Sequence, residues 1–410
     1  MRYRWVVLAV ATFTQAAAAF FVQGLGALGV QLQRDLGVNA AQLGLLISAA
    51  QLAPLIGLLV AGELLDRFDE RWVVGAGAGA VGVALIAGTF APGYAALLGV
   101  LLVVGAGYST VQPGGSKSVA AWFDASRRGT AMGIRQAGLP LGAALASAAL
   151  PAVAAAFGWR ATLPAGGLVA LLGGAAFVLL YRRPPGQPVT TRQTGPRLAL
   201  LRVPALRRAL LCGVSLISVQ CGIGLLTVLH LHEVATLSAG RAALILVAAQ
   251  AAGVAGRILL AAWSDSARWQ RQSVVTVSLI AVAAALVLLM TPAGRYPVAA
   301  GAVFVWLGFF GIGWYGPWVA LVTEAAPPGR TGFALGLAMA VNQVAIVLVP
   351  PVLGLLRDAT GGFATPWGLL LAMTGAALLG LVRSRGGRSP TGPVPVGEDG
   401  LRAGPTSDAA

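Results

Sequence analysis

The chain alternates long apolar runs with short polar connections. Each run has about 20 residues or more, enough for a helix to cross the roughly 30 Å hydrocarbon core of a bilayer. The runs are rich in Ala, Leu, Gly and Val and lack the regular alternation of β-barrel strands, so helices are the predicted elements. We predict twelve, over residues 5–27, 41–62, 72–91, 94–122, 129–156, 161–181, 208–230, 242–263, 273–291, 297–324, 331–356 and 363–382.

The composition also indicates a membrane protein. Of the 410 residues, 57% are hydrophobic and 10% are charged, which is too little polar surface for a soluble domain. The net charge of +15 would indicate nucleic-acid binding in a soluble protein. Here the arginines lie between apolar runs and form no continuous basic face, so we expect contact with the lipid bilayer and not with nucleic acid. The first run follows Met1–Trp5 without a cleavage-site pattern, which predicts an uncleaved helix.

Basic residues predict the orientation of the chain. They are concentrated at both chain ends and in alternate connections, whereas the opposite connections carry only five. Because positively charged connections stay on the cytoplasmic side, we expect a multi-pass protein of the inner (cytoplasmic) membrane with both termini in the cytoplasm.

The connection after the sixth helix divides the chain into two halves. Residues 182–207 are rich in Arg, Pro, Gln, Thr and Gly, and consecutive prolines there cannot continue a helix. We expect residues 1–181 and 208–382 to form two six-helix bundles joined by this cytoplasmic linker. Residues 383–410, rich in Gly, Pro, Ser and charge, are predicted to be a disordered cytoplasmic tail.

The connection between the second and third helices is a short, highly charged stretch, Gly62-Glu-Leu-Leu-Asp-Arg-Phe-Asp-Glu-Arg71. So much charge between two apolar runs predicts a turn at the membrane surface. The stretch resembles the corresponding loop of major facilitator superfamily transporters, Gly-x-x-x-Asp-Arg-x-Gly-Arg-Arg. Gly62, Asp66, Arg67 and Arg71 match that pattern, whereas Asp69 and Glu70 replace a glycine and a basic residue.

Three features of the first half recur in the second half in the same order, as expected of related bundles. The charged stretch has a weaker copy that includes Asp265, Arg268 and Arg271. A Gly-x-Gly followed by proline occurs in the fourth and tenth helices, and a basic residue followed by small residues opens the fifth and eleventh. The paired segments are 62–71 with 261–271, 105–113 with 311–317, and 128–133 with 330–336.

The resemblance, which covers nearly all of Trp5 to Val382, implies the major facilitator fold of two pseudo-symmetric six-helix bundles that rock around a central cavity. It also implies a gating role for residues at the cytoplasmic surface. Asp66 is expected to cap a helix end, or to pair with an arginine such as Arg128, when the outward-facing state closes the cytoplasmic side. The candidate gating residues are Gly62, Asp66, Arg67, Arg71, Arg128 and Asp265.

In that family, helices 1, 4, 7 and 10 line the cavity, and the polar or aromatic residues on them are candidates for substrate binding. An alternative for each is a structural role, since Gln bonds across helices and Trp sits at membrane interfaces. The candidates are Gln15, Gln23, Tyr108, Gln112, Ser215, Gln220, Trp306, Trp314, Tyr315 and Trp318, with Asn342 on the eleventh helix.

Three basic residues, Lys117, Arg135 and Arg257, lie inside apolar runs, whereas no acidic residue lies deep in a run. A charge inside a membrane is costly, so it usually faces a cavity and has a function. Positive charge without a resident acid favours an anionic ligand. The alternative is that these long side chains extend to the membrane surface.

The segment Gly253-Val-Ala-Gly-Arg257 resembles the eighth-helix arginine of oxalate/formate antiporters, monocarboxylate carriers and nitrate/nitrite porters, where it engages the substrate anion. The second helix lacks the arginine that nitrate porters carry, so a carboxylate ranks above nitrate. No ATP-binding loop is present. We therefore expect a secondary active transporter that moves a small organic anion by alternating access, as proton symport or anion exchange.

The seventh helix ends in His230-Leu-His-Glu233, which contains both histidines. The two rings point to different sides of a helix and lack further ligands, so a solvated helix end is preferred to a metal site. His230 and Glu233, three residues apart, form an alternative proton relay. Cys212 and Cys221 lie on opposite faces of this helix and are not expected to form a disulfide.

Two other functions are compatible with the same fold. Drug or cationic metabolite efflux is the first alternative, although the first helix offers no acid to balance a cation. A nontransporting membrane sensor is another, although the 26-residue linker and the tail are too short for a soluble module. No catalytic constellation indicates an enzyme, and we expect a monomer without cofactor or metal.

Overall fold

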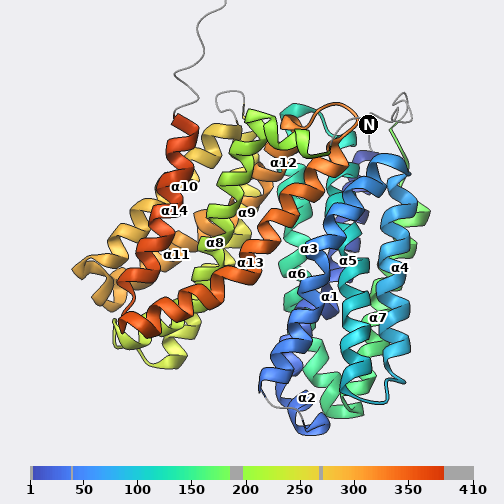
Figure 1. Cartoon of the computed structure of the whole chain (residues 1–410), viewed down its shortest axis with the longest axis horizontal. Coiled ribbons are helices and arrows are strands. Elements are labelled where there is room, and N and C mark those ends of the chain that lie inside the picture. Colours follow the sequence, from blue (N-terminus) through green and yellow to red (C-terminus); the bar gives the residue numbers. More distant parts are fainter. Residues whose placement is uncertain (1–2, 38–39, 185–196, 267–270, 383–410) are drawn as a thin grey trace, which may run out of the picture.

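The computed structural model describes residues 3–37, 40–184, 197–266 and 271–382. Every regular element in these residues is helical, and twelve helices are long and apolar enough to cross a membrane. Figure 1 shows the earlier helices on one side and the later helices on the other. Their ribbons meet near the end where the N-terminus lies and diverge toward the opposite end. The predicted tail at 383–410, residues 185–196 of the linker and Arg268 lie outside the described residues.

The first half contains six long helices and one short helix. Helix α1 continues through the 3-10 helix η1 (Leu25–Leu28) into α2, and η2 (Trp159–Ala161) precedes α7. The α-helices are α1 Tyr3–Gly24, α2 Gly29–Leu36, α3 Ala40–Arg67, α4 Glu70–Gly88, α5 Tyr94–Trp122, α6 Ala125–Phe157 and α7 Thr162–Leu180.

The second half follows the 3-10 helix η3 (Arg197–Arg202) and contains a further short 3-10 helix, η4 (Pro292–Arg295). Its α-helices are α8 Pro204–Glu233, α9 Ala239–Ser264, α10 Arg271–Met290, α11 Pro297–Gly313, α12 Tyr315–Ala325, α13 Thr331–Thr360 and α14 Ala364–Val382.

Several sequence-based boundaries differ from the structure, among them the unpredicted short helix α2, and two of the differences have a clear cause. The charged stretch is not a ten-residue turn, because α3 continues to Arg67 and α4 begins at Glu70. Its charges support the helix ends: Glu63 pairs with Arg67 one turn later at 2.5 Å, and the Asp69 carboxylate accepts a hydrogen bond from the Arg71 amide at 2.8 Å.

The predicted tenth helix is interrupted between α11 and α12 at Trp314. Pro317 explains the interruption, since its ring nitrogen cannot donate a hydrogen bond to the carbonyl four residues earlier, at Gly313. The backbone continues in nearly the same conformation, so α11 and α12 together form one span, Pro297–Ala325.

Two helix pairs make the largest contacts between the bundles: α3 packs along α13, and α6 packs along α9, while α12 also packs against α6. Both contacts depend on glycine. A Cβ atom on Gly336 would lie 3.0 Å from the Gly62 Cα and still closer to the Leu58 carbonyl oxygen. A Cβ on Gly133 would lie 2.6 Å from the Ala261 Cβ and meet the Arg257 carbonyl. Small residues thus let the two backbones touch.

We predict that Gly336→Ala destabilises the protein by about 1–3 kcal/mol, because the added methyl group forces α3 and α13 apart. The measurement is the thermal unfolding midpoint of the purified protein. Gly79→Ala in α4 is the matched control, since a Cβ there meets nothing within 4 Å. Equal midpoints for the two variants would contradict this account of the α3–α13 contact.

Candidate functional site

A central cavity of about 250 Å³ lies between the bundles. Most of the residues that line it are polar, although they belong to apolar helices of both halves. Candidates that line it are Gln23, Tyr108, Gln112, Gln220, Arg257, Tyr315 and Asn342, and they are joined by Gln51, Gln136, Leu139, Ile217, Cys221, Met339, Gln343 and Ile346.

Arg257 is the charged residue of this wall. Its side chain extends from α9 and is only 4% exposed. Nε donates a hydrogen bond to the Ile312 carbonyl at 3.3 Å, and Nη1 donates to the Gln136 carbonyl of α6 at 2.9 Å. The Tyr315 ring lies 5.7 Å from the guanidinium carbon. Among the described residues no carboxylate pairs with this guanidinium and Nη2 has no partner, so the cavity wall presents an uncompensated positive charge.

Arg135, a second candidate, lies behind the cavity wall. It is fully buried, and its guanidinium donates hydrogen bonds to the Ser116 hydroxyl, the Gln15 side chain and the carbonyls of Val111 and Gln112, all at 2.8–2.9 Å. Gln15 in turn donates to the Tyr108 hydroxyl at 3.3 Å. Arg135 and Gln15 therefore position the wall residue Tyr108 without lining the cavity.

Several carboxamides of the wall are buried without hydrogen-bond partners in the described structure. Both polar side-chain atoms of Gln136 and of Asn342 are of this kind, as is Oε1 of Gln220. A buried polar group without a partner costs about 1–3 kcal/mol. Because these atoms are buried, a polar ligand in the cavity would satisfy them only after the side chains turn toward it.

Four aromatic or hydroxyl candidates do not line the cavity. Trp318 donates a hydrogen bond to the Ala209 carbonyl at 2.6 Å, and Ser215 donates to the Thr374 hydroxyl at 3.3 Å. Trp314 is fully buried against Tyr315 and Trp318, and Trp306 is half exposed on the outside of α11. A structural role, and not substrate binding, therefore fits Trp306, Trp318 and Ser215.

The end of the molecule near the N-terminus is closed by two related contacts between the bundles. In the first, the carboxylate of Asp66 at the end of α3 accepts hydrogen bonds from the backbone amides of Gly332 and Phe333, both at 2.8 Å. These amides belong to the first turn of α13, where backbone N–H groups have no partner within the helix. We name this contact the Asp66 latch.

The second contact, named the Asp265 latch, repeats this arrangement. Asp265, which caps the C-terminus of α9, accepts hydrogen bonds from the amides of Gly129 and Thr130 of α6, at 2.8 and 2.6 Å. Arg271 bridges Asp265 and Glu324 at 2.8 and 2.6 Å and also contacts the Ala125 carbonyl. Each latch thus joins an aspartate of one bundle to two backbone amides of a helix of the other, in the first turn of α13 for Asp66 and in the second turn of α6 for Asp265.

The remaining gating candidates contribute differently. Arg128 pairs with Glu324 at 3.5 Å and not with Asp66, so the structure favours the helix-capping alternative for Asp66. Arg67 pairs with Glu63 within α3. Arg71 stacks over Trp72 at 5.2 Å. Neither of these two arginines joins the bundles in the described structure.

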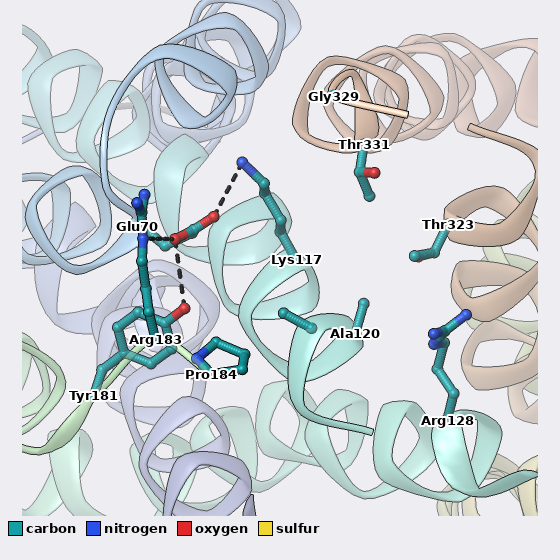
Figure 2. A pocket seen from close by; sticks show the side chains of 11 residues that line it. Glu70, Lys117, Ala120, Arg128, Tyr181, Arg183, Pro184, Thr323, Gly329 and Thr331 are labelled. Atoms are coloured by element: carbon teal, nitrogen blue, oxygen red, sulfur yellow. Dashed lines mark hydrogen bonds and ion pairs between the residues drawn. The ribbon is translucent and has the colours of Figure 1, made fainter. Parts of the chain in front are cut away.

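The expectation that Lys117 is a cation without a resident acid is wrong. Lys117 lies at the latch end, where Nζ is 3.0 Å from Glu70 and 3.6 Å from Asp66 and donates to the Leu65 carbonyl. It lines a separate pocket of about 300 Å³, shown in Figure 2 with Glu70 between Lys117, Tyr181 and Arg183. Only the tertiary fold brings these residues from α4, α5 and the end of α7 together.

Two groups complete this cluster around Glu70. Arg183 lies 3.4 Å from its carboxylate and 2.9 Å from Asp69. Burial raises the pKa of Tyr181, so the phenol stays protonated and donates a hydrogen bond to Glu70 at 3.4 Å. The cluster is therefore a compensated ion-pair network.

His230 does not lie at a solvated helix end, because it is buried against Phe304, Phe363 and Trp367. Its Nδ1 accepts a hydrogen bond from Trp367, and its Nε2 lies 3.2 Å from the Gly294 carbonyl. Glu233 instead pairs with Arg357 at 2.5 Å. The structure therefore does not bring His230 and Glu233 together as a relay.

The sequence analysis missed Gln51, Gln136 and Gln343 as cavity residues. Each is a carboxamide inside an apolar run, and Gln343 also donates a hydrogen bond to the Gln51 carbonyl at 2.9 Å across the bundles. They would have been found if every carboxamide inside an apolar run had been a candidate, and not only those on the first, fourth, seventh and tenth helices.

Comparisons with known proteins agree with this architecture. The family model described as Major Facilitator Superfamily matches residues 8–350. An uncharacterized MFS-type transporter of Mycobacterium tuberculosis is 30% identical over 387 residues, covering 89% of this chain and 82% of the relative. The probable galactarate/D-glucarate transporter of Bacillus subtilis is 24% identical over 377 residues, covering 82% and 81%.

Among solved structures, the fold is similar to that of the transporter FucP in the outward conformation. The TM-score is 0.76 at 17% sequence identity, and the match covers 93% of this chain and 99% of that one.

We predict that Lys117→Met lowers the free energy of unfolding by about 3 kcal/mol, because Glu70 and Asp66 lose their shared cation in a poorly hydrated site. Thermal unfolding of the purified protein measures this change, and Lys117→Arg is the matched control that keeps the charge. A variant of unchanged stability that loses anion binding would instead make Lys117 a substrate ligand.

Proposed function

Because the chain belongs to the major facilitator superfamily of multi-pass membrane transporters, we propose that it carries a small organic anion, with Arg257 as the anchor for a carboxylate. The single observation that carries this proposal is the buried guanidinium of Arg257 at the wall of the central cavity, without a carboxylate partner among the described residues.

The buried charge of Arg257 lowers the stability of the protein. An arginine at the centre of a membrane helix costs about 2.5–3.5 kcal/mol on insertion scales, so an isolated one is retained at the expense of stability. An anion in the cavity would offset that cost. A carboxylate is suited to the guanidinium because it accepts charge-assisted hydrogen bonds in its plane, and Nη2 is available to donate one.

Buried positive charge behind the wall strengthens the preference for an anion. Arg135 adds a second guanidinium without a carboxylate partner in the described structure. The acidic residues that the structure describes lie near the ends of helices, as at Asp66, Asp265 and Glu324. A cationic substrate would find no counter-charge on the cavity wall, which disfavours cation efflux.

The latches support alternating access as the transport mechanism. Concentration of basic residues at the latch end is the basis for assigning that end to the cytoplasm. With the latch end in the cytoplasm, the formed latches would make this the outward-facing state of the proposed carrier in the inner membrane. Exposure of the cavity to the cytoplasm would require both aspartates to leave the helix N-termini, where water can replace them.

We predict that Arg257→Gln lowers the affinity for small carboxylates at least tenfold, because a charge-assisted hydrogen bond contributes about 1.5–3 kcal/mol. Uptake of labelled carboxylates into proteoliposomes and their affinity for the purified protein are the two measurements. Arg241→Gln, at an exposed site of α9, is the matched control. Equal uptake by wild type and Arg257→Gln would overturn the proposal.

We predict that Asp66→Asn slows transport about fivefold or more while changing substrate affinity less than twofold. An amide oxygen lacks the charge that favours a helix N-terminus, so the outward-facing state loses about 1–2 kcal/mol. Asp265→Asn should have the same effect. Asp358→Asn, which is exposed and pairs with Arg357 at the opposite end, is the control. Lost substrate binding in a correctly folded variant would contradict a purely conformational role.

A further inference from the structure

The cavity wall carries one type of polar group in unusual number. Apart from Arg257 and the phenols of Tyr108 and Tyr315, its polar residues are almost all carboxamides. A carboxamide both donates and accepts hydrogen bonds, as does an alcohol hydroxyl. A carboxylate only accepts hydrogen bonds, and an apolar chain neither donates nor accepts them. These carboxamides are Gln23, Gln51, Gln112, Gln136, Gln220, Asn342 and Gln343.

The unpartnered atoms of this wall indicate what the ligand must supply. Asn342 and Gln136 each have a donor and an acceptor without a partner in the described residues, and Gln220 has an unpartnered acceptor. Asn342 is 2% exposed and Gln136 is fully buried. An apolar ligand would leave these groups unsatisfied, whereas several hydroxyls could pair with them.

The charge of the wall limits the ligand to one carboxylate. Arg257 is the charged side chain among the residues that line the cavity. Arg135 lies behind the wall, where its terminal nitrogens already donate to four acceptors. A second carboxylate on the ligand would face carboxamides in a poorly hydrated site and would lack an ion-pair partner.

The cavity volume limits the size of the ligand. Its volume of about 250 Å³ lies below the range of roughly 300–1,000 Å³ that is typical of sites for drug-sized ligands. The site is therefore suited to a small, compact molecule.

We infer that the substrate is a small polyhydroxylated monocarboxylate of the sugar-acid type, with its carboxylate on Arg257 and its hydroxyls on Gln136, Gln220 and Asn342. This inference rests on the proposed function of the same cavity and narrows its substrate class. Gln136 has the most direct role, because its backbone carbonyl already accepts a hydrogen bond from Arg257. The carboxylate and the first hydroxyl of the ligand would thus bind to neighbouring groups.

Four classes of probe separate this inference from the proposed function. The full chain, purified in detergent, is titrated with six-carbon aldonates (gluconate, galactonate and mannonate), the corresponding aldarates, hexanoate and the neutral hexitols. The tightest aldonate is expected to bind at least tenfold more tightly than the tightest aldarate, hexanoate or hexitol. A site built to hydrogen-bond hydroxyls rejects ligands that lack them, because its own groups then stay unpaired.

Hexanoate or an aldarate that binds as tightly as the best aldonate would overturn the inference and leave an anion carrier intact. Hexitols that bind as tightly as aldonates, or the absence of binding by every anion tested, would overturn the proposed function itself.

Variants of the wall provide the second measurement. Asn342→Leu and Gln136→Leu keep side-chain size and should each weaken aldonate binding tenfold or more while leaving the weaker hexanoate binding within twofold. Gln220→Leu serves the same purpose where either variant fails to purify as a monodisperse protein. Equal loss for aldonate and hexanoate in folded variants would overturn the assignment of these carboxamides to hydroxyls.

Discussion

Two aspartates that cap helices of the opposite bundle hold this structure in its observed state. Asp66 accepts two backbone hydrogen bonds at the first turn of α13, where the amides have no partner within the helix, and Asp265 accepts two from Gly129 and Thr130 in the second turn of α6. The contact needs no side chain on the helix that donates the amides, so glycine can stand at Gly332 and Gly129, where the backbones approach closely. Because water can satisfy the same groups, each contact can be broken without leaving buried polar atoms unpaired.

Because the carboxylates lie at helix ends, the interior of the molecule is left with positive charge. The carboxylates of Asp66, Glu70, Asp265 and Glu324 are compensated at the latch end by amides, Lys117 and arginines. The middle of the molecule keeps the guanidinium of Arg257 at a small polar cavity. In a medium of low dielectric constant this separation produces a positive site at the cavity, which is the physical basis of the proposed anion transport.

Sequence patterns predicted some parts of the site better than others. The repeat of an aspartate after the second and eighth helices predicted a symmetric pair of gate residues, since a duplicated contact leaves duplicated residues. Arg257 and Asn342 were also recognised as candidates that line the cavity. Lys117 was misassigned because its partner Glu70 lies 47 positions away on another helix, and sequence spacing cannot reveal a contact made by helix packing. His230 was misassigned for the same reason, since Trp367 covers it.

The sequence by itself determined the fold class, the twelve spans and the pairing of related segments in the two halves. These properties follow from local hydrophobic length and from repetition, because lipid allows only helices to satisfy every backbone group along a span. The tertiary structure decided which polar residues face the cavity, which arginine keeps an uncommitted nitrogen, and which end of the molecule is closed. These outcomes depend on helix rotation and on contacts between distant segments, such as Gln136 with Arg257, which are fixed only when the helices pack together.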